Sequence, residues 1–210
     1  MTRGAHLVVV GCLLLLSGAA IADADAASDT YVHQAFIALD RGDVEADGAR
    51  KRTAYNDAVA QAEKAVRLDE ANANAHYALF CSLGRLTELR GSIAQALMLP
   101  RLHRELNRAL QLNPAHSDAL AAKAEMLFRL PRLLGGSVVQ AETYVRRALQ
   151  YDPTYWRAHI LLARILIAQS RPSAARAELT ALLAHIDPQR HERAEAIELL
   201  AELGDASGSS

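Results

Sequence analysis

The sequence has few of the residues on which several common kinds of binding site depend. Its 210 residues include two cysteines, one tryptophan and three phenylalanines, and its net charge is -1. A nearly neutral chain has no basic field to hold a nucleic acid backbone, and its aromatic residues are not clustered as a base-stacking surface would be. We therefore do not expect nucleic acid as a partner.

The motifs of common catalytic and metal sites are also missing. The sequence has no GxxxxGK[ST], HExxH, CxxC or GxSxG. Gly135, Gly136 and Ser137 form a Gly-Gly-Ser run, but no Lys follows it and no apolar strand precedes it. Ser137 and Gln140 fit a capping box, in which each side chain bonds a backbone N–H at the start of a helix. We expect no catalytic residue, no cofactor and no metal ion.

The N-terminal residues have the composition of an export signal. Arg3 precedes an apolar run at Leu7–Leu16, and small residues follow it. This predicts a signal peptide at residues 1–24, cleaved near residues 22–26, and a secreted or periplasmic protein with no membrane insertion after cleavage. The alternatives are a membrane anchor formed by this segment and lipidation at Cys12. Cleavage would leave Cys81 as the only cysteine, either a small buried hydrophobe or a reactive thiol.

Three segments of the chain repeat one another. They read EKAVRLDEANANAHYAL, NRALQLNPAHSDALAAK and RRALQYDPTYWRAHILL. Ala65, Ala109, Ala148 and Leu182 occupy the same place in successive repeats, at spacings that equal 34 residues plus insertions of ten, five and none. A period of 34 residues with a helix-turn-helix unit is typical of the tetratricopeptide repeat (TPR).

The sequence resembles the TPR family at these positions. Ala58, Leu102, Ala141 and Ala175 stand at the preceding small-residue position, and Pro114 and Pro153 at the proline that ends a unit. The expected fold is an all-α, right-handed TPR α-solenoid of about four helix pairs with a C-terminal capping helix. The Pro and Gly-Gly insertion before Ser137 is similar to that of exported bacterial TPR proteins, with weaker similarity to TRAP-transporter-associated TPR proteins and TPR-like microtubule-dynamics regulators.

The repeat register divides the chain into units. We expect the TPR domain at residues 28–203, with units at 30–71, 72–115, 116–154 and 155–188, a capping helix at 189–203 and a disordered tail at 204–210. In the capping helix, Ala194, Ile197, Leu200 and Ala201 are predicted to face inward. The insertion at residues 91–102 is interpreted either as an extended helix that covers the core, broken at Pro100, or as a lid that faces a ligand.

The resemblance implies a function as well as a fold. TPR proteins bind an extended peptide or a partner's helix on the concave surface formed by the first helix of each pair. The residues expected to face this groove are Asn74, Tyr77, Cys81, Arg85, Asp118, Glu125, Phe128, Arg157, Ile160 and Arg164. The sequence therefore predicts a non-catalytic scaffold that binds a protein or peptide partner. The alternative is a transport accessory that binds a solute-binding protein, or a small hydrophobic ligand near Met98; the oligomeric state stays open.

Overall fold

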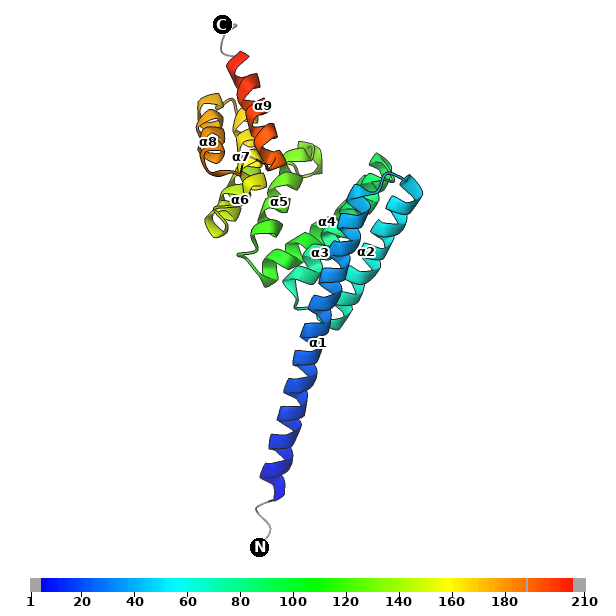
Figure 1. Ribbon diagram of the computed structural model, residues 1–210. Helices are drawn as coiled ribbons and strands as arrows, with labels where there is room; N and C mark the ends of the chain where they lie inside the picture. The colour runs from blue at the N-terminus through cyan, green and yellow to red at the C-terminus, as the bar shows by residue number, and fades with distance from the viewer. Residues whose placement is uncertain (1–4, 188, 206–210) are drawn as a thin grey trace. The chain divides into compact units, whose positions relative to one another are not determined.

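The computed structural model describes residues 5–187 and 189–205, and all of its regular structure is helical (Figure 1). The chain divides into two compact units, residues 1–114 and 115–210. Within each unit the helices pack in successive antiparallel pairs, as an α-solenoid requires. The prediction of an all-α TPR solenoid is thereby confirmed at the level of the fold class.

The first unit contains four helices that pack as two pairs. They are α1 (Ala5–Val44), α2 (Gly48–Leu68), α3 (Ala73–Glu88) and α4 (Ser92–Leu112). Helices α1 and α2 lie side by side, α3 packs against α4, and α3 also contacts both helices of the preceding pair. Asp47 and Asn72 cap α2 and α3, because their side-chain oxygens accept the backbone N–H groups of the first turn.

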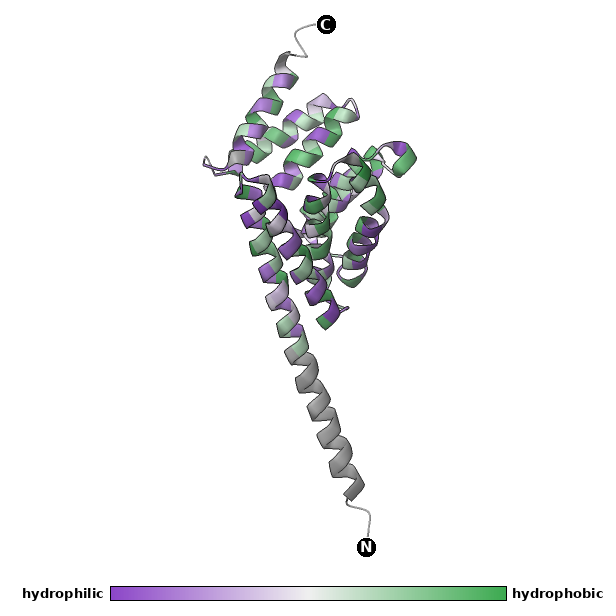
Figure 2. Cartoon of the chain, turned by 90° about the vertical axis from the view of Figure 1, so that its right-hand side faces the viewer, coloured by the Kyte–Doolittle hydropathy of each residue, from purple (hydrophilic) through white to green (hydrophobic). Residues whose placement is uncertain are grey.

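The second unit contains the remaining five α-helices of the described chain. They are α5 (Ser117–Arg129), α6 (Val138–Tyr151), α7 (Trp156–Ala168), α8 (Pro172–His185) and α9 (His191–Asp205), with a short 3-10 turn, η1 (Arg132–Leu134), between α5 and α6. Helix α5 packs on α6, α7 packs on α8, and α9 packs on both α7 and α8. Most helices carry hydrophobic residues on one face and polar residues on the other (Figure 2).

Small residues occupy the points of closest helix approach. Three residues at the first small-residue position of the repeat are fully buried: Ala58, Ala141 and Ala175. Ala65 and Ala148, at the second small-residue position, are fully buried as well. A small side chain lets two helix backbones approach closely, and the larger apolar side chains then fill the space between pairs. The repeat positions read from the sequence thus coincide with the core.

The insertion at residues 91–102 forms part of α4. Helix α4 continues through Pro100, so the expectation that Pro100 breaks it is wrong. Pro100 and Ala96 are both exposed, and water can therefore bond the Ala96 carbonyl that Pro100 leaves without an N–H donor. Met98 and Leu102 pack against the core cluster of the first unit, as an extended covering helix would, while Ile93 and Leu97 remain exposed.

The Gly-Gly-Ser run forms a tight connection between α5 and α6. Gly135 has φ of +91°, and a Cβ on Gly136 would lie 1.7 Å from the carbonyl oxygen of Leu130. The Ser137 Oγ accepts the Gln140 N–H, as the capping box predicts. The Ser137 N–H, however, donates to the carbonyl of Leu127 at the end of α5 rather than to the Gln140 side chain. The connection therefore satisfies a free carbonyl at one helix end with a donor from the next helix.

The inward face of α9 differs from the expected one. Ala194 and Ala201 are exposed, Ile197 is 50% exposed and Leu200 is half-buried, whereas Glu192, Ala196 and Leu203 are buried. The helix carries two apolar stripes, and the stripe through Ala196 and Leu203 is the one that meets α7 and α8. The expected tail begins at Gly204, but α9 continues to Asp205, and residues 206–210 lie outside the described chain.

Helix α1 runs without interruption from Ala5 to Val44, so the predicted cleavage region lies within it. The predicted signal peptide also includes residues 1–4, which lie outside the described residues. In the part of the chain that the structure describes, no helix combines the length and the apolar character needed to cross a bilayer. Export and cleavage stay predictions.

Candidate functional site: an arginine-lined hollow in the second unit

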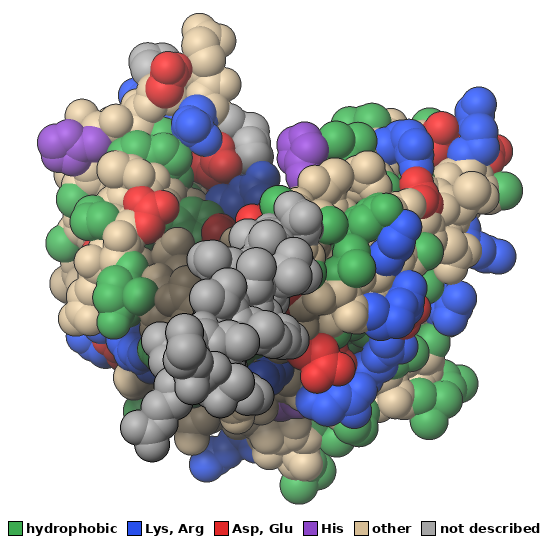
Figure 3. All heavy atoms as spheres, turned by 90° about the horizontal axis from the view of Figure 1, so that it is seen from below, with side chains coloured by type: hydrophobic (Ala, Val, Ile, Leu, Met, Phe, Trp, Pro, Cys, Tyr) green, Lys and Arg blue, Asp and Glu red, His purple; other side chains and the backbone are tan. Residues whose placement is uncertain are grey.

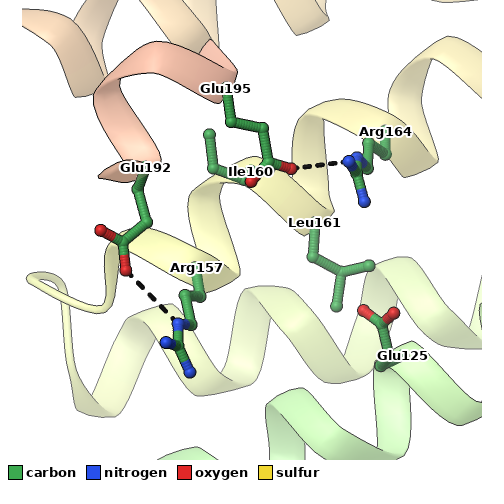
Figure 4. Close-up of a pocket in the computed structure, with 7 residues that line it drawn as sticks. All are labelled: Glu125, Arg157, Ile160, Leu161, Arg164, Glu192 and Glu195. Atoms are coloured by element: carbon green, nitrogen blue, oxygen red, sulfur yellow. Dashed lines mark hydrogen bonds and ion pairs between the residues drawn. The ribbon is translucent and has the colours of Figure 1, made fainter. Parts of the chain in front are cut away.

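Four of the predicted groove residues lie together in the second unit. Glu125 of α5 and Arg157, Ile160 and Arg164 of α7 line one hollow of about 150 Å³ (Figure 4). Leu161 of α7 and Glu192 and Glu195 of α9 complete its lining. We call this set of seven residues the arginine hollow. Its volume suits one or two side chains of a partner, not a drug-sized ligand.

Both arginines of the hollow form ion pairs with α9. The Arg157 Nε lies 3.3 Å from the Glu192 Oε1, and the Arg164 Nη2 lies 2.7 Å from the Glu195 Oε1 (Figure 4). The Arg157 and Arg164 side chains are 69% and 46% exposed, while that of Glu192 is only 6% exposed. The positive charge predicted from the sequence is therefore present, but it faces two carboxylates of the same chain.

Sequence reasoning missed the two glutamates because they lie more than thirty positions from the arginines. Their spacing carried a signal: Glu192 and Glu195 are one helical turn apart and therefore lie on the same side of α9. The pattern alone did not say which face of α9 is turned inward.

Two groove residues of the second unit, Asp118 and Phe128, do not line the arginine hollow, and Ile160, which does, is less accessible than expected. Ile160 is 4% exposed, so its side chain supports the core more than it faces a partner. Phe128 lines a separate hollow of about 260 Å³ beside the α5–α6 connection. Asp118 stands in the first turn of α5, where its charge opposes the lowering of the His116 pKa that burial causes.

Two of the predicted groove residues of the first unit, Tyr77 and Arg85, contact α1. Tyr77 lies between Phe36 of α1 and Phe80, with ring centroids 6.1 and 6.4 Å away. Cys81 is half-buried and forms no disulfide, and Asn74 is exposed. Both interpretations of Cys81, a packing residue and a reactive thiol, stay open.

Arg85 belongs to a polar network that the sequence did not predict. Asp43 accepts a hydrogen bond from the Tyr55 hydroxyl at 2.6 Å and lies 3.2 Å from the Arg85 guanidinium. Burial, followed by this bond to Asp43, raises the pKa of Tyr55 to about 12. Tyr55 therefore remains protonated and donating, and Arg85 ties α3 to the end of α1.

Two histidines at the same repeat position, His76 and His159, contact the same kinds of partner: one carboxylate and one backbone carbonyl. The Nδ1 atoms of His76 and His159 bond Glu105 and Glu178, each on the second helix of the same pair, at 2.9 Å in the first case. Their Nε2 atoms face the backbone carbonyls of Glu70 and Pro153, six residues earlier in each unit. Carboxylate and carbonyl oxygens can only accept, so the His159 ring satisfies both of its partners as the doubly protonated imidazolium.

The His159 joint predicts a stability that falls as pH rises. The bond to Glu178, and after it the bond to the Pro153 carbonyl, raise the pKa of His159 above 6.5 in spite of burial. A raised folded-state pKa gives stability that is complete below pH 6.5 and is lost as pH rises through the folded-state value. We therefore expect wild type to be more stable than His159→Leu, which places at this position the residue that Leu120 supplies in the preceding unit, with the largest difference near pH 5.5.

Thermal unfolding of both proteins between pH 5.5 and 9 measures this difference. Because His159→Leu removes the titrating ring and leaves Glu178 in place, a loss of the wild-type advantage across that range reports His159 itself. A difference in melting temperature that does not change with pH would contradict the imidazolium assignment.

The described chain gathers no metal-ligating cluster. Within residues 5–187 and 189–205, no three His, Cys, Asp or Glu side chains lie close enough together to hold a metal ion.

On the face shown in Figure 3, Lys and Arg side chains are interspersed with hydrophobic and acidic ones.

Comparison with known proteins places the chain in a family. Residues 132–203 match the tetratricopeptide repeat model, and residues 21–124 match the model described as Regulator of microtubule dynamics protein 1-3. The chain is a tetratricopeptide repeat protein, as the sequence resemblance predicted. None of the curated proteins compared with the chain matches it.

Solved structures support the same fold. A structure from work on Pseudomonas aeruginosa pilF is 21% identical, with a TM-score of 0.63 over 87% of this chain and 72% of that one. TTC0263, a thermophilic TPR protein of Thermus thermophilus, is 16% identical, with a TM-score of 0.60 over 83% of this chain and 100% of that one. YrrB, a TPR protein with an unusual peptide-binding site, is 18% identical, with a TM-score of 0.50 over 73% and 70%. At these identities the likeness concerns the fold alone.

Proposed function

We propose that this protein is a non-catalytic scaffold that binds a protein or peptide partner, and that the arginine hollow is part of the binding surface. TPR domains typically bind protein or peptide partners. The observation that supports this most directly is the gathering of Glu125, Arg157 and Arg164 around one hollow. Both arginines are accessible, and a guanidinium can bind a carboxylate through two parallel hydrogen bonds.

The alternative of a small hydrophobic ligand near Met98 has less support. Met98 packs against the core cluster of the first unit together with Leu102. A hollow of about 520 Å³ in that unit is lined mostly by polar side chains, which include Arg104, Glu105 and Arg108. Such a lining does not suit an apolar ligand.

We further propose that the protein is exported, with residues 1–24 as a signal peptide. The support is the apolar run at Leu7–Leu16 and the small residues that follow it. N-terminal sequencing of protein recovered from cells tests this: a first residue near positions 22–26 is expected, and an intact N-terminus would contradict it.

Neutralising both arginines should reduce partner capture. Because the Arg157→Gln and Arg164→Gln pair removes the two cations of the hollow, we expect at least a tenfold loss of the partner recovered by crosslinking in cells and mass spectrometry. Reversal of the charge by Arg157→Glu is less informative, because it would set a second carboxylate against the buried Glu192 and disturb folding.

The matched control is Arg146→Gln with Arg171→Gln. These arginines belong to the same unit and both pair with Glu142, outside the hollow, so the change in net charge is identical. Equal recovery by the control and the hollow variant would contradict the assignment of the hollow.

A further inference from the structure

Helix α9 is held on the second unit by a small apolar contact and by several polar ones. Of its described hydrophobic side chains, Ala196 and Leu203 are buried, Leu199 and Leu200 are half-buried, and Ile197 is half exposed. By contrast, seven hydrophobic residues of α7 are buried. An element that buries little apolar surface undocks at a small cost in free energy, well below that of global unfolding.

The polar contacts of α9 with the rest of the second unit include four that join named side chains. Two are the ion pairs of Glu192 and Glu195 with the arginines of the hollow. The other two join arginine side chains to backbone carbonyls: the Arg193 Nη1 donates to Leu183 at 3.1 Å, and the Arg176 Nη2 donates to Leu203 at 2.8 Å. The Arg164–Glu195 pair is partly exposed, so its attraction is weak and decreases as the salt concentration rises. Of these four contacts, the two ion pairs are the ones that another carboxylate-bearing helix can replace.

The charge pattern defines what fits the hollow. Arg157 and Arg164 are seven residues apart on α7 and so lie on one side of it, two turns apart. Glu192 and Glu195 reach them from a single face of α9, one turn apart (Figure 4). The chain thus contains its own example of a ligand for this surface: a helix with two carboxylates at positions i and i+3.

We propose that α9 is an intramolecular ligand of the arginine hollow, and that the partner is an acidic helical segment with the same carboxylate spacing, which displaces α9. The inference rests on the proposed function of the hollow and adds to it both the chemistry of the partner and a self-occupied resting state. Only molecules in which α9 is undocked can bind the partner. The apparent association constant is therefore the intrinsic constant multiplied by the undocked fraction.

A peptide copy of α9 tests the competition. The probe is a fluorescent peptide of residues 189–205, and its control is the same peptide with Gln at both glutamate positions. In the full-length chain, Glu192→Gln with Glu195→Gln removes the intramolecular carboxylates, and we expect it to bind the probe about tenfold more tightly than wild type does. The gain should be smaller at 0.5 M salt, and the control peptide should show none.

Substitution of the two arginines tests whether the gain in probe affinity arises at the arginine hollow. Adding Arg157→Gln and Arg164→Gln to the glutamate variant should abolish it. Hydrogen exchange adds a readout of docking: α9 amides should exchange faster than α7 amides in wild type, and faster still in the glutamate variant.

Equal probe affinity for wild type and the glutamate variant, or α9 amides as protected as those of α7, would overturn the proposal and make α9 a fixed cap. This failure is distinguishable from failure of the proposed function. If partner capture depends on Arg157 and Arg164 while the α9 peptide does not bind, the hollow binds a partner of another chemistry. If capture is independent of both arginines, the function assignment itself is wrong.

Discussion

Gly136→Ala should unfold the second unit under conditions in which wild type is stable. A Cβ at this position would lie 1.7 Å from the Leu130 carbonyl oxygen and 2.6 Å from its carbon, and both are backbone atoms that no rotamer change can move. The backbone of the α5–α6 connection must therefore shift, which breaks the bond from the Gly136 N–H to the Pro131 carbonyl and displaces Ser137 from Leu127. We expect a loss of more than about 3 kcal/mol in the free energy of unfolding.

Urea unfolding followed by tryptophan fluorescence measures this loss. Trp156, the only tryptophan of the chain, lies in α7 and reports the second unit. Gly135→Ala is the matched control: its Cβ meets open space, and its cost is limited to a positive φ, about 1 to 2 kcal/mol. Similar midpoints for the two variants would show that the close approach at Leu130 is not what Gly136 is needed for.

The fold was predictable from the sequence because the same pattern of small and large residues recurs in several repeats. Small residues recur at Ala58, Ala141 and Ala175, and each is fully buried. A 34-residue period with small residues at fixed positions is compatible with few folds other than stacked helix pairs. The Gly-Gly-Ser turn was predicted as well, but the need for glycine at Gly136 depends on the path of the chain after Leu130, which no local pattern specifies.

The site was predictable only in part. A helix projects residues at fixed angles, so Arg157 and Arg164 could be assigned to one face of their helix from spacing alone. Their partners could not, because α9 has two apolar stripes, one through Ile197 and one through Leu203, and either could face inward. The stripe through Leu203 is the buried one, and α9 makes its ion pairs with residues more than thirty positions earlier, which no local pattern specifies.

Phe80 illustrates a deviation that the fold absorbs. It stands where Ala124 and Ala163 are fully buried, a position that usually requires a small residue. The Phe80 ring is only partly buried and packs along Tyr77, 6.4 Å between centroids. The first unit thus accommodates a large side chain by leaving part of it at the surface. A small-residue position from which a large side chain cannot reach the surface should not tolerate replacement by Phe.

Ala175→Phe should therefore be among the most destabilising substitutions of the second unit. Ala175 of α8 is fully buried at the small-residue position of its repeat, and a benzyl group there must separate α8 from its neighbours. Overpacking of this kind typically costs about 1 to 3 kcal/mol, and for a full aromatic ring between two helices we expect about 3 kcal/mol or more.

Ala177→Phe provides the control, because Ala177 is exposed on the same helix only two residues away. Helix propensity changes equally in the two variants, so the difference between their urea midpoints, read from Trp156 fluorescence, isolates packing at the close approach. We expect Ala177→Phe to stay within about 1 kcal/mol of wild type, since surface substitutions usually have small effects. If both variants lose the same stability, the small-residue positions reflect helix propensity rather than the packing of one helix pair on the next.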